Sequence, residues 1–259
     1  MSALIDKLEQ ALRAGGAQPL GFGTATAKAR PVQLALVISL PRPAAEELPT
    51  LAKAGVEGVL LLEPPTNDFV AAAREHKLFW GVRAQHARPQ EVDALKEAGC
   101  DFLVYGVDSP VQLFDQAGIG QVLALEAAAA ESLAGGVETL APGAIYLPLD
   151  DMPYVSIRRL ILCQRLARMA RKPLLVQVHP AIAAEELAAL CDAGAAGVVA
   201  EARGAAATTL AGRLRDAIAA LPPRGKRAKA SKSGAILPQL HLAPTPADEG
   251  EPEEPDEDE

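Results

Sequence analysis

Ionisable side chains stand directly after several short apolar stretches of this sequence, and they are the first candidates for chemistry. Five of them carry groups that bind an anion or move a proton: Glu63, Arg83, Glu126, His179 and Glu201. A carboxylate that follows apolar residues is a candidate general acid or base, because burial raises its pKa towards neutrality while a neighbouring cation lowers it. A guanidinium holds an anionic substrate, and an imidazole acts as an acid or a hydrogen-bond donor. These residues are far apart along the chain, so the fold must bring them together.

A recurring local pattern indicates the elements that position them. Three segments each contain a helical pattern that ends in Ala-Gly and leads into an apolar strand, with the glycines at Gly55, Gly99 and Gly194. Glycine at the end of a helix takes the left-handed conformation that caps it. The strands are continuous apolar runs, which is typical of parallel strands covered by helices.

Eight such runs recur every 20 to 29 residues, and helical patterns fill most of the intervals. They begin near Gln33, Glu57, Leu78, Asp101, Gln121, Ala144, Pro173 and Ala196. Eight βα units predict an α/β fold, a single (β/α)8 barrel of the TIM type. An open doubly wound sheet is the alternative, but its dinucleotide-binding glycine fingerprint is absent from the sequence. In a barrel the carboxyl ends of all strands share one mouth, where the five candidates would converge.

The barrel is expected over residues 31–222, between two segments of different character. Residues 1–30 are predicted to form an N-terminal helix, capped by Ser2, and a loop that leads into the barrel. Residues 223–259 are predicted to be a disordered tail with five bases at 224–232, a short apolar segment at 236–242 and nine acids in the last fifteen residues. Without those fifteen residues, 24 acidic residues face 25 basic ones, so the net charge of −8 belongs to the tail.

Over residues 31–221 the chain resembles the large group of phosphate- and FMN-binding (β/α)8 barrels that includes indoleglycerol phosphate synthase and thiamine phosphate synthase. The resemblance lies in the glycine-capped helices before short apolar strands, especially Ala193–Val199 before the last helix. It implies a phosphate or FMN site after strands seven and eight, where Arg203, Gly204 and Thr208 are ligand-binding candidates. However, the loop His179–Ile182 lacks the glycine pair of that group, and Glu201 would repel a phosphate. The cofactor therefore stays open between none, FMN and a phosphate-bearing ligand.

Two tyrosines complete the ligand-binding candidates. Tyr105 ends the fourth strand, and Tyr154 lies in a long loop with Asp150 and Asp151 that could close over a ligand or contact a second subunit. His86 follows the third strand closely enough to reach the same mouth. No spacing of His, Cys or carboxylates is typical of a metal site, so none is predicted. For every strand-end residue, the alternative to a functional role is that the strand ends at the solvent, where charged side chains of the rim pair with one another.

The preferred hypothesis is an enzyme, a lyase or isomerase that acts on a small anionic metabolite by general acid/base chemistry at the strand ends. The alternative is a catalytically degenerate barrel that acts as a ligand-binding or scaffold protein through its tail. Aromatic residues make up only 3% of the chain, which disfavours nucleic acid as a partner. Three dispersed cysteines are expected to be buried free thiols, and the N-terminus lacks a signal-peptide pattern, which together suggest a cytoplasmic protein. No stretch is typical of a membrane span, and an oligomer is possible.

Overall fold

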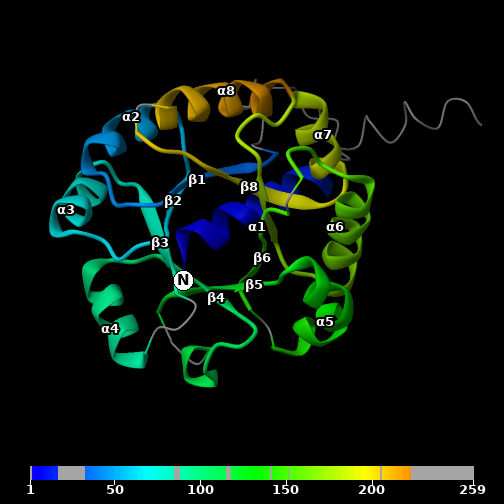
Figure 1. Cartoon of the computed structure of the whole chain (residues 1–259), viewed down its shortest axis with the longest axis horizontal. Helices are drawn as coiled ribbons and strands as arrows, with labels where there is room; N and C mark the ends of the chain where they lie inside the picture. The colour runs from blue at the N-terminus through cyan, green and yellow to red at the C-terminus, as the bar shows by residue number, and fades with distance from the viewer. Residues whose placement is uncertain are drawn as a thin grey trace, which may run out of the picture.

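The eight predicted strands close into one parallel barrel in the computed structural model (Figure 1). The structure describes residues 2–16, 33–84, 88–114, 118–140, 142–150, 152–204 and 206–222. The strands pair in sequence order and the eighth pairs with the first, which confirms the (β/α)8 fold. They are β1 (Ala35–Leu40), β2 (Gly58–Leu61), β3 (Phe79–Arg83), β4 (Phe102–Gly106), β5 (Gly120–Ala124), β6 (Ala144–Leu147), β7 (Leu174–Val178) and β8 (Ala195–Glu201).

Helices α2 to α8 form a ring around the barrel that is incomplete at one place, and α1 (Ala3–Gly16) lies at the end of the barrel. The helices of the ring are α2 (Leu48–Lys53), α3 (Asn67–Glu75), α4 (Pro89–Ala98), α5 (Ala127–Leu140), α6 (Ile157–Met169), α7 (Ala184–Asp192) and α8 (Ala206–Ala220). A short 3-10 helix, η1 (Ala45–Glu47), precedes α2. Among the described residues, the connection from β4 to β5 contains only the 3-10 turn η2 (Val111–Leu113), where an α-helix usually stands. Figure 1 shows this turn between α4 and α5.

The barrel has two cores because successive strand residues face opposite sides. In β6, for example, Tyr146 packs inside the barrel, whereas Ile145 and Leu147 pack between the strands and the helices. Both faces of the strands are buried, which explains why the sequence shows continuous apolar runs rather than alternation.

Helix α1 covers the amino ends of the strands. Leu4 and Leu8 belong to the inner core, and Ser2 caps the helix as predicted, its Oγ accepting a hydrogen bond from the Ile5 N–H at 3.4 Å. Asp101, just before β4, accepts hydrogen bonds from the Ser2 hydroxyl at 2.7 Å and from the main-chain N–H of residues 3 and 4. A carboxylate at a helix N-terminus satisfies unpaired N–H groups and interacts favourably with the helix dipole. α1 therefore closes one end of the barrel, and the mouth is at the other.

The glycine-capped connections are also confirmed. Gly55, Gly99 and Gly194 have φ values of 74°, 93° and 102°, in the left-handed region that favours glycine. The three cysteines are buried free thiols. Within the described ranges, no helix is both long and apolar enough to cross a membrane. The predicted loop before the barrel and the predicted tail fall on residues 17–32 and 223–259, outside those ranges.

Candidate active site

Arg83 points into the barrel at its open end. It is the last residue of β3 and shares the inner face with Gly81, whereas Trp80 and Val82 pack in the outer core. Its Nε atom is buried and has no hydrogen-bond partner in the described part of the chain. A buried N–H without an acceptor is costly, so this position favours an acceptor supplied by a ligand or water. Arg83 is therefore the strongest anion-binding candidate.

Tyr146 of β6 lies on the same inner face. Its hydroxyl donates a hydrogen bond to Oε1 of Gln177 at 2.6 Å, and the main-chain N–H of Leu149 donates to the same oxygen at 3.1 Å. Burial raises the pKa of Tyr146 to about 12, a shift that Arg83 opposes and Glu201 reinforces. These two charges act on the buried phenol from β3 and β8, so the three residues face one region. At neutral pH Tyr146 is a neutral hydrogen-bond donor.

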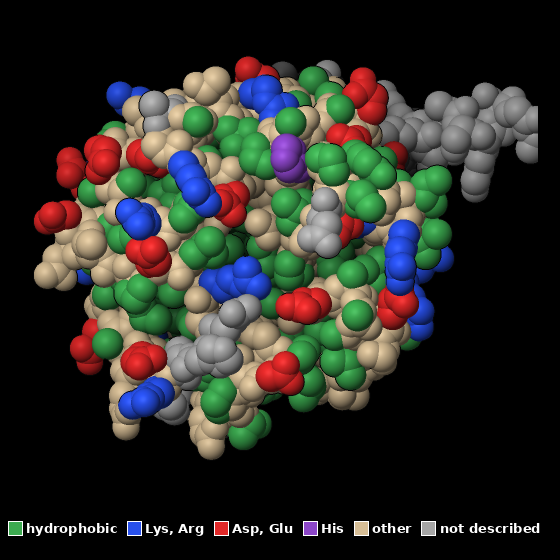
Figure 2. All heavy atoms as spheres, viewed as in Figure 1, with side chains coloured by type: hydrophobic (Ala, Val, Ile, Leu, Met, Phe, Trp, Pro, Cys, Tyr) green, Lys and Arg blue, Asp and Glu red, His purple; other side chains and the backbone are tan. Residues whose placement is uncertain are grey.

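Glu201 ends β8 and borders a cavity at the mouth. Its side chain is 34% exposed and accepts an ion pair from Arg203 at 3.1 Å. The cavity has a volume of about 480 Å³ and includes Gln177 from β7 and the first residue of α8, Ala206. Figure 2, viewed down the barrel, shows acidic and basic side chains among hydrophobic ones near the centre of the ring. A carboxylate there can take a proton from a bound molecule.

His179 follows β7, next to this cavity. Its Nδ1 accepts a hydrogen bond from the main-chain N–H of Ala181 at 3.2 Å, so in the neutral ring the proton is on Nε2. His179 and Tyr154 line one small crevice together with Gln177, which also lines the cavity of Glu201. The imidazole can therefore present an N–H donor near the mouth, whereas Tyr154 is 56% exposed.

The other two carboxylate candidates are not brought into this cluster. Glu63 follows β2 and pairs with the exposed Arg42 at 3.7 Å. Both line a neighbouring cavity of about 520 Å³ between the ends of β1, β2 and β8, which shares Ala202 and Arg203 with the cavity of Glu201. Glu126 is exposed after β5 and makes no ion pair with any described residue. Both lie at the correct end of the barrel, but neither is held beside Arg83.

Two of the ligand-binding candidates point away from the mouth. Tyr105 packs in the outer core, where its ring meets Phe114 edge to face and its hydroxyl lies 3.4 Å from Oε1 of Gln121. Thr208, in the first turn of α8, donates a hydrogen bond to Thr50 of α2 at 2.8 Å.

The loop before α8 does not fit a phosphate group in this arrangement. The main-chain N–H of Gly204 already donates to the carboxylate of Glu47, the last residue of η1. Burial, and secondly the charge of Glu46, raise the pKa of Glu47, whose Oε2 is buried without a described partner. Arg203 pairs with Glu201 on the other side of the loop. A phosphate here would meet two carboxylates, so the loop does not suit the phosphate of a substrate or of FMN.

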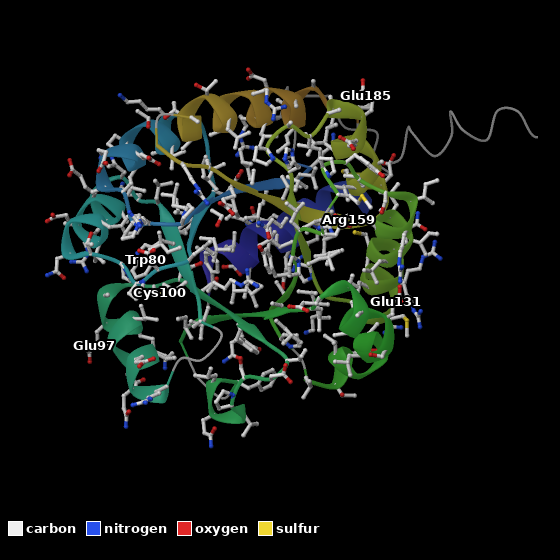
Figure 3. All side chains as sticks on the ribbon, in the orientation of Figure 1. Trp80, Glu97, Cys100, Glu131, Arg159 and Glu185 are labelled. Atoms are coloured by element: carbon white, nitrogen blue, oxygen red, sulfur yellow. The ribbon has the colours of Figure 1, made fainter. Side chains whose placement is uncertain are left out.

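Arg159, which was not predicted from the sequence, is a buried residue of α6 that holds the site in place. It is 4% exposed and lies on the barrel side of α6 (Figure 3). Its Nη2 donates hydrogen bonds to the main-chain carbonyls of Pro148 and Gln177, both at 2.8 Å, and its Nη1 lies 3.4 Å from Asp150. It therefore fixes the ends of β6 and β7, which carry Tyr146 and Gln177.

Some candidates fall outside the described residues, namely His86 and Asp151. Among the residues that are described, no group of three or more His, Cys, Asp or Glu side chains is placed to hold a metal ion.

Comparisons with known proteins show the fold. No family model matches the chain, and no curated protein matches it. Solved barrels do match. Tryptophan synthase from M. tuberculosis, in an open form, is 16% identical with a TM-score of 0.59, covering 85% of this chain and 100% of that one. A variant tryptophan synthase alpha-subunit from Pyrococcus furiosus is 15% identical with a TM-score of 0.55, covering 71% and 96%. Thiamine phosphate pyrophosphorylase from the same organism is 12% identical with a TM-score of 0.54, covering 72% and 96%. The resemblance predicted from sequence is thus confirmed as a likeness of architecture.

Proposed function

We propose that this protein is a barrel enzyme, a lyase or isomerase that acts on a small anionic metabolite at the mouth. The observation that carries the proposal is the buried, unpaired Nε of Arg83 on the inner face of the barrel, the face that Tyr146 and Glu201 share. A guanidinium with an unused inward N–H is suited to a carboxylate or phosphate of the substrate. The solved barrels with this architecture include a synthase and a pyrophosphorylase, which supports an enzyme of this general kind.

The chemistry that suits these residues is proton transfer next to a carbonyl. The anionic end of the substrate binds Arg83, and a carboxylate oxygen of Glu201 removes a proton from the carbon beside the carbonyl. The electron pair of the broken C–H bond moves onto the carbonyl oxygen, where an N–H or O–H donor stabilises the negative charge. The Nε2–H of His179 is the donor at this end of the barrel, because the hydroxyl of Tyr146 already donates to Gln177. In an isomerisation, Glu201 returns the proton to another atom of the enolate. In a lyase reaction, the electron pair of the enolate re-forms the carbonyl and expels the group on the β-carbon, which takes the proton from Glu201 and leaves.

Anion binding is tested by calorimetric titration of the full chain with malonate and with inorganic phosphate. Arg83→Met removes the charge at similar side-chain length, and Arg42→Met is the matched control, because Arg42 is exposed and pairs with Glu63 outside the cluster. We expect binding by the wild type and by Arg42→Met, and loss of at least about tenfold in affinity for Arg83→Met. Equal affinity of wild type and Arg83→Met for both anions would refute the role of Arg83.

Proton transfer is tested without knowledge of the product by deuterium incorporation. Small anionic carbonyl compounds such as pyruvate and dihydroxyacetone phosphate are incubated with the protein in D2O, and their C–H signals are followed by NMR. Glu201→Gln should slow any catalysed exchange by about a hundredfold or more, since a positioned base contributes that much. Exchange that is catalysed equally by wild type and Glu201→Gln would exclude Glu201 as the base.

Binding or scaffolding through the tail stays the alternative function. Residues 223–259 lie outside the described ranges, so its support is the sequence pattern of bases, apolar residues and acids. Deletion of residues 224–259 separates the two hypotheses. The enzyme hypothesis expects anion binding and exchange to survive the deletion, whereas the scaffold hypothesis expects partner capture to be lost with an unchanged melting temperature.

A further inference from the structure

The large hydrophobic side chains that the described residues expose are concentrated on one side of the barrel. Nine of the ten lie between Val107 and Met169, and the tenth is Leu62. They belong to the segment after β4, α5, the β6–α6 loop and α6. We call the surface formed by η2, α5 and α6 the α5–α6 face. Monomeric proteins rarely expose a large apolar surface, so this face is a candidate interaction site.

The first half of the face is an apolar groove. Because only η2 stands between β4 and β5, a cavity of about 350 Å³ remains between η2 and α5. Its walls come from the outer core and from the near side of α5, and its rim includes Gly136. The apolar lining consists mainly of Tyr105, Val107, Pro110, Val111, Phe114, Leu123, Leu125, Leu133, Val137 and Leu140.

The second half of the face is an apolar ridge on α6. Ile157 and Ile161 lie one helical turn apart and are 77% and 60% exposed. The opposite side of α6 is the buried one, with Leu162 and Leu166 in the outer core. Exposing an isoleucine side chain to water costs free energy, and burying it in an apolar groove would recover that free energy.

Charge divides the same face into two halves. No Lys, Arg or His occurs between Lys96 and Arg158, so the groove and α5 carry acids alone. α6 exposes Arg158, Arg165 and Arg168, and Arg168 has no acidic partner among the described residues. Two ion pairs cross the seam between the helices, Arg158–Glu131 at 3.1 Å and Arg171–Glu138 at 3.6 Å. Figure 3 labels Glu131 on the α5 side of this seam. These pairs use both glutamates of α5. Asp108 on the groove half and Arg165 and Arg168 on the ridge half are exposed and form no ion pair with a described residue.

We propose that the α5–α6 face is a two-fold interface between two copies of this chain, in which the ridge of each copy fills the groove of the other. A two-fold rotation about an axis parallel to α5 and α6 exchanges the two halves of the face, so ridge meets groove twice. The same rotation places the basic α6 of each copy over the groove half of the other, where the sequence carries acids alone. The exposed residues of α5 include small ones such as Ser132 and Gly136, which allows close approach. A second copy is the occupant that matches both halves at once.

The proposal is tested by measuring the mass of the full chain in solution by light scattering over a concentration series. We expect the wild type to approach twice its 27.0 kDa mass. Ile161→Glu damages the ridge, and Gly136→Phe fills the groove, where an added Cβ meets nothing within 4 Å. Each change enters a two-fold interface twice, so each should weaken the dimer by about a hundredfold. Leu62→Glu, an exposed hydrophobic position outside the face, is the matched control and should stay dimeric.

Mixing the two variants distinguishes a broken contact from a damaged fold. In a mixed dimer one ridge–groove contact carries both substitutions, while the other joins an intact ridge to an intact groove. Mixing Ile161→Glu with Gly136→Phe should therefore restore part of the dimer that neither variant forms alone. A monomeric wild type, or dimers that persist in both variants, would overturn the proposal. If the wild type is monomeric and deletion of residues 236–242 increases binding of an apolar dye, the tail occupies the groove instead.

Discussion

The guanidinium of Arg159 donates a hydrogen bond to the main-chain carbonyl of Gln177 at 2.8 Å, while the side chain of Gln177 accepts the hydroxyl of Tyr146. The buried arginine on α6 and the amide on β7 thus form a chain of contacts that ends inside the mouth. Helix α6 also carries the exposed ridge on its other side. Changes to Arg159 should therefore disturb the site through its support rather than through contact with a ligand.

Arg159→Met should destabilise the protein by about 3 kcal/mol, because it leaves two partly buried carbonyls and the carboxylate of Asp150 without their donor. Urea unfolding followed by circular dichroism measures the loss. Arg74→Met, at an exposed position on α3, is the control and should change little. A loss equal to that of the control would show that the network around Arg159 adds nothing to stability.

Raising the pH should destabilise the fold through Tyr146. Its pKa rises from 10 to about 12 on folding, so its stabilising contribution is complete below pH 10 and is lost as the pH rises between 10 and 12. The midpoint of urea unfolding should fall over this window. Tyr146→Phe should lower stability by about 1 kcal/mol at neutral pH and should flatten the alkaline decline. Burial also raises the pKa of Tyr105, so a part of the decline should persist. An unchanged alkaline decline in Tyr146→Phe would contradict the assignment.

Glu47→Gln should raise the melting temperature at neutral pH. The pKa of Glu47 is raised in the folded protein, chiefly by burial, so the folded state favours its protonated form. Its contribution is therefore favourable below the pKa of an unfolded glutamate and is lost as the pH rises through the folded pKa. Glutamine keeps an oxygen for the Gly204 N–H and removes the charge. Thermal unfolding of the wild type and of Glu47→Gln is measured at neutral and at acidic pH. The difference between their melting temperatures should be smaller at acidic pH. A melting-temperature difference that is larger at acidic than at neutral pH would contradict the prediction.

Gly81→Ala should be strongly destabilising, by about 3 kcal/mol. An added Cβ would lie 2.4 Å from both the ring and the carbonyl oxygen of Phe102 inside the barrel. Gly106→Ala, at the end of the next strand, is the matched control because its added Cβ meets nothing within 4 Å. We expect it to be neutral or slightly stabilising, since alanine reduces the freedom of the unfolded chain. Equal stability of the two variants, measured by urea unfolding, would refute the close contact between Gly81 and Phe102 inside the barrel.

The architecture could be predicted from the sequence because its signals are local. Continuous apolar runs mark the strands, and the glycines at positions 55, 99 and 194 mark where helices end. The position of α1 could not be predicted, since its contact with Asp101 joins residues about a hundred positions apart. The lack of an α-helix among the described residues between β4 and β5 was also not predicted, because counting strands does not reveal which connection lacks a helix.

The candidate site was predicted less completely than the fold. Strand alternation brings Arg83 and Glu201 to the inner face, but a shift of one residue turns a strand-end side chain to the other face. Glu63 lies beyond the last paired residue of β2 and meets Arg42 instead. Tyr105 and Tyr146 differ in the same way: the first packs outside the barrel and the second inside. Counting alternate residues from the middle of β6 would have found Tyr146. The roles of all these residues in catalysis stay predictions.

The cap that Asp101 forms on α1 has a consequence for the order of binding and release in the proposed reaction. With one end of the barrel sealed by a helix, a molecule that reaches Arg83 arrives and departs by the same opening. A reaction that splits one substrate into two fragments then cannot release them along separate routes. The fragment nearer the solvent leaves first, and the one held by Arg83 leaves second, so inhibition by the two products should follow different kinetic patterns.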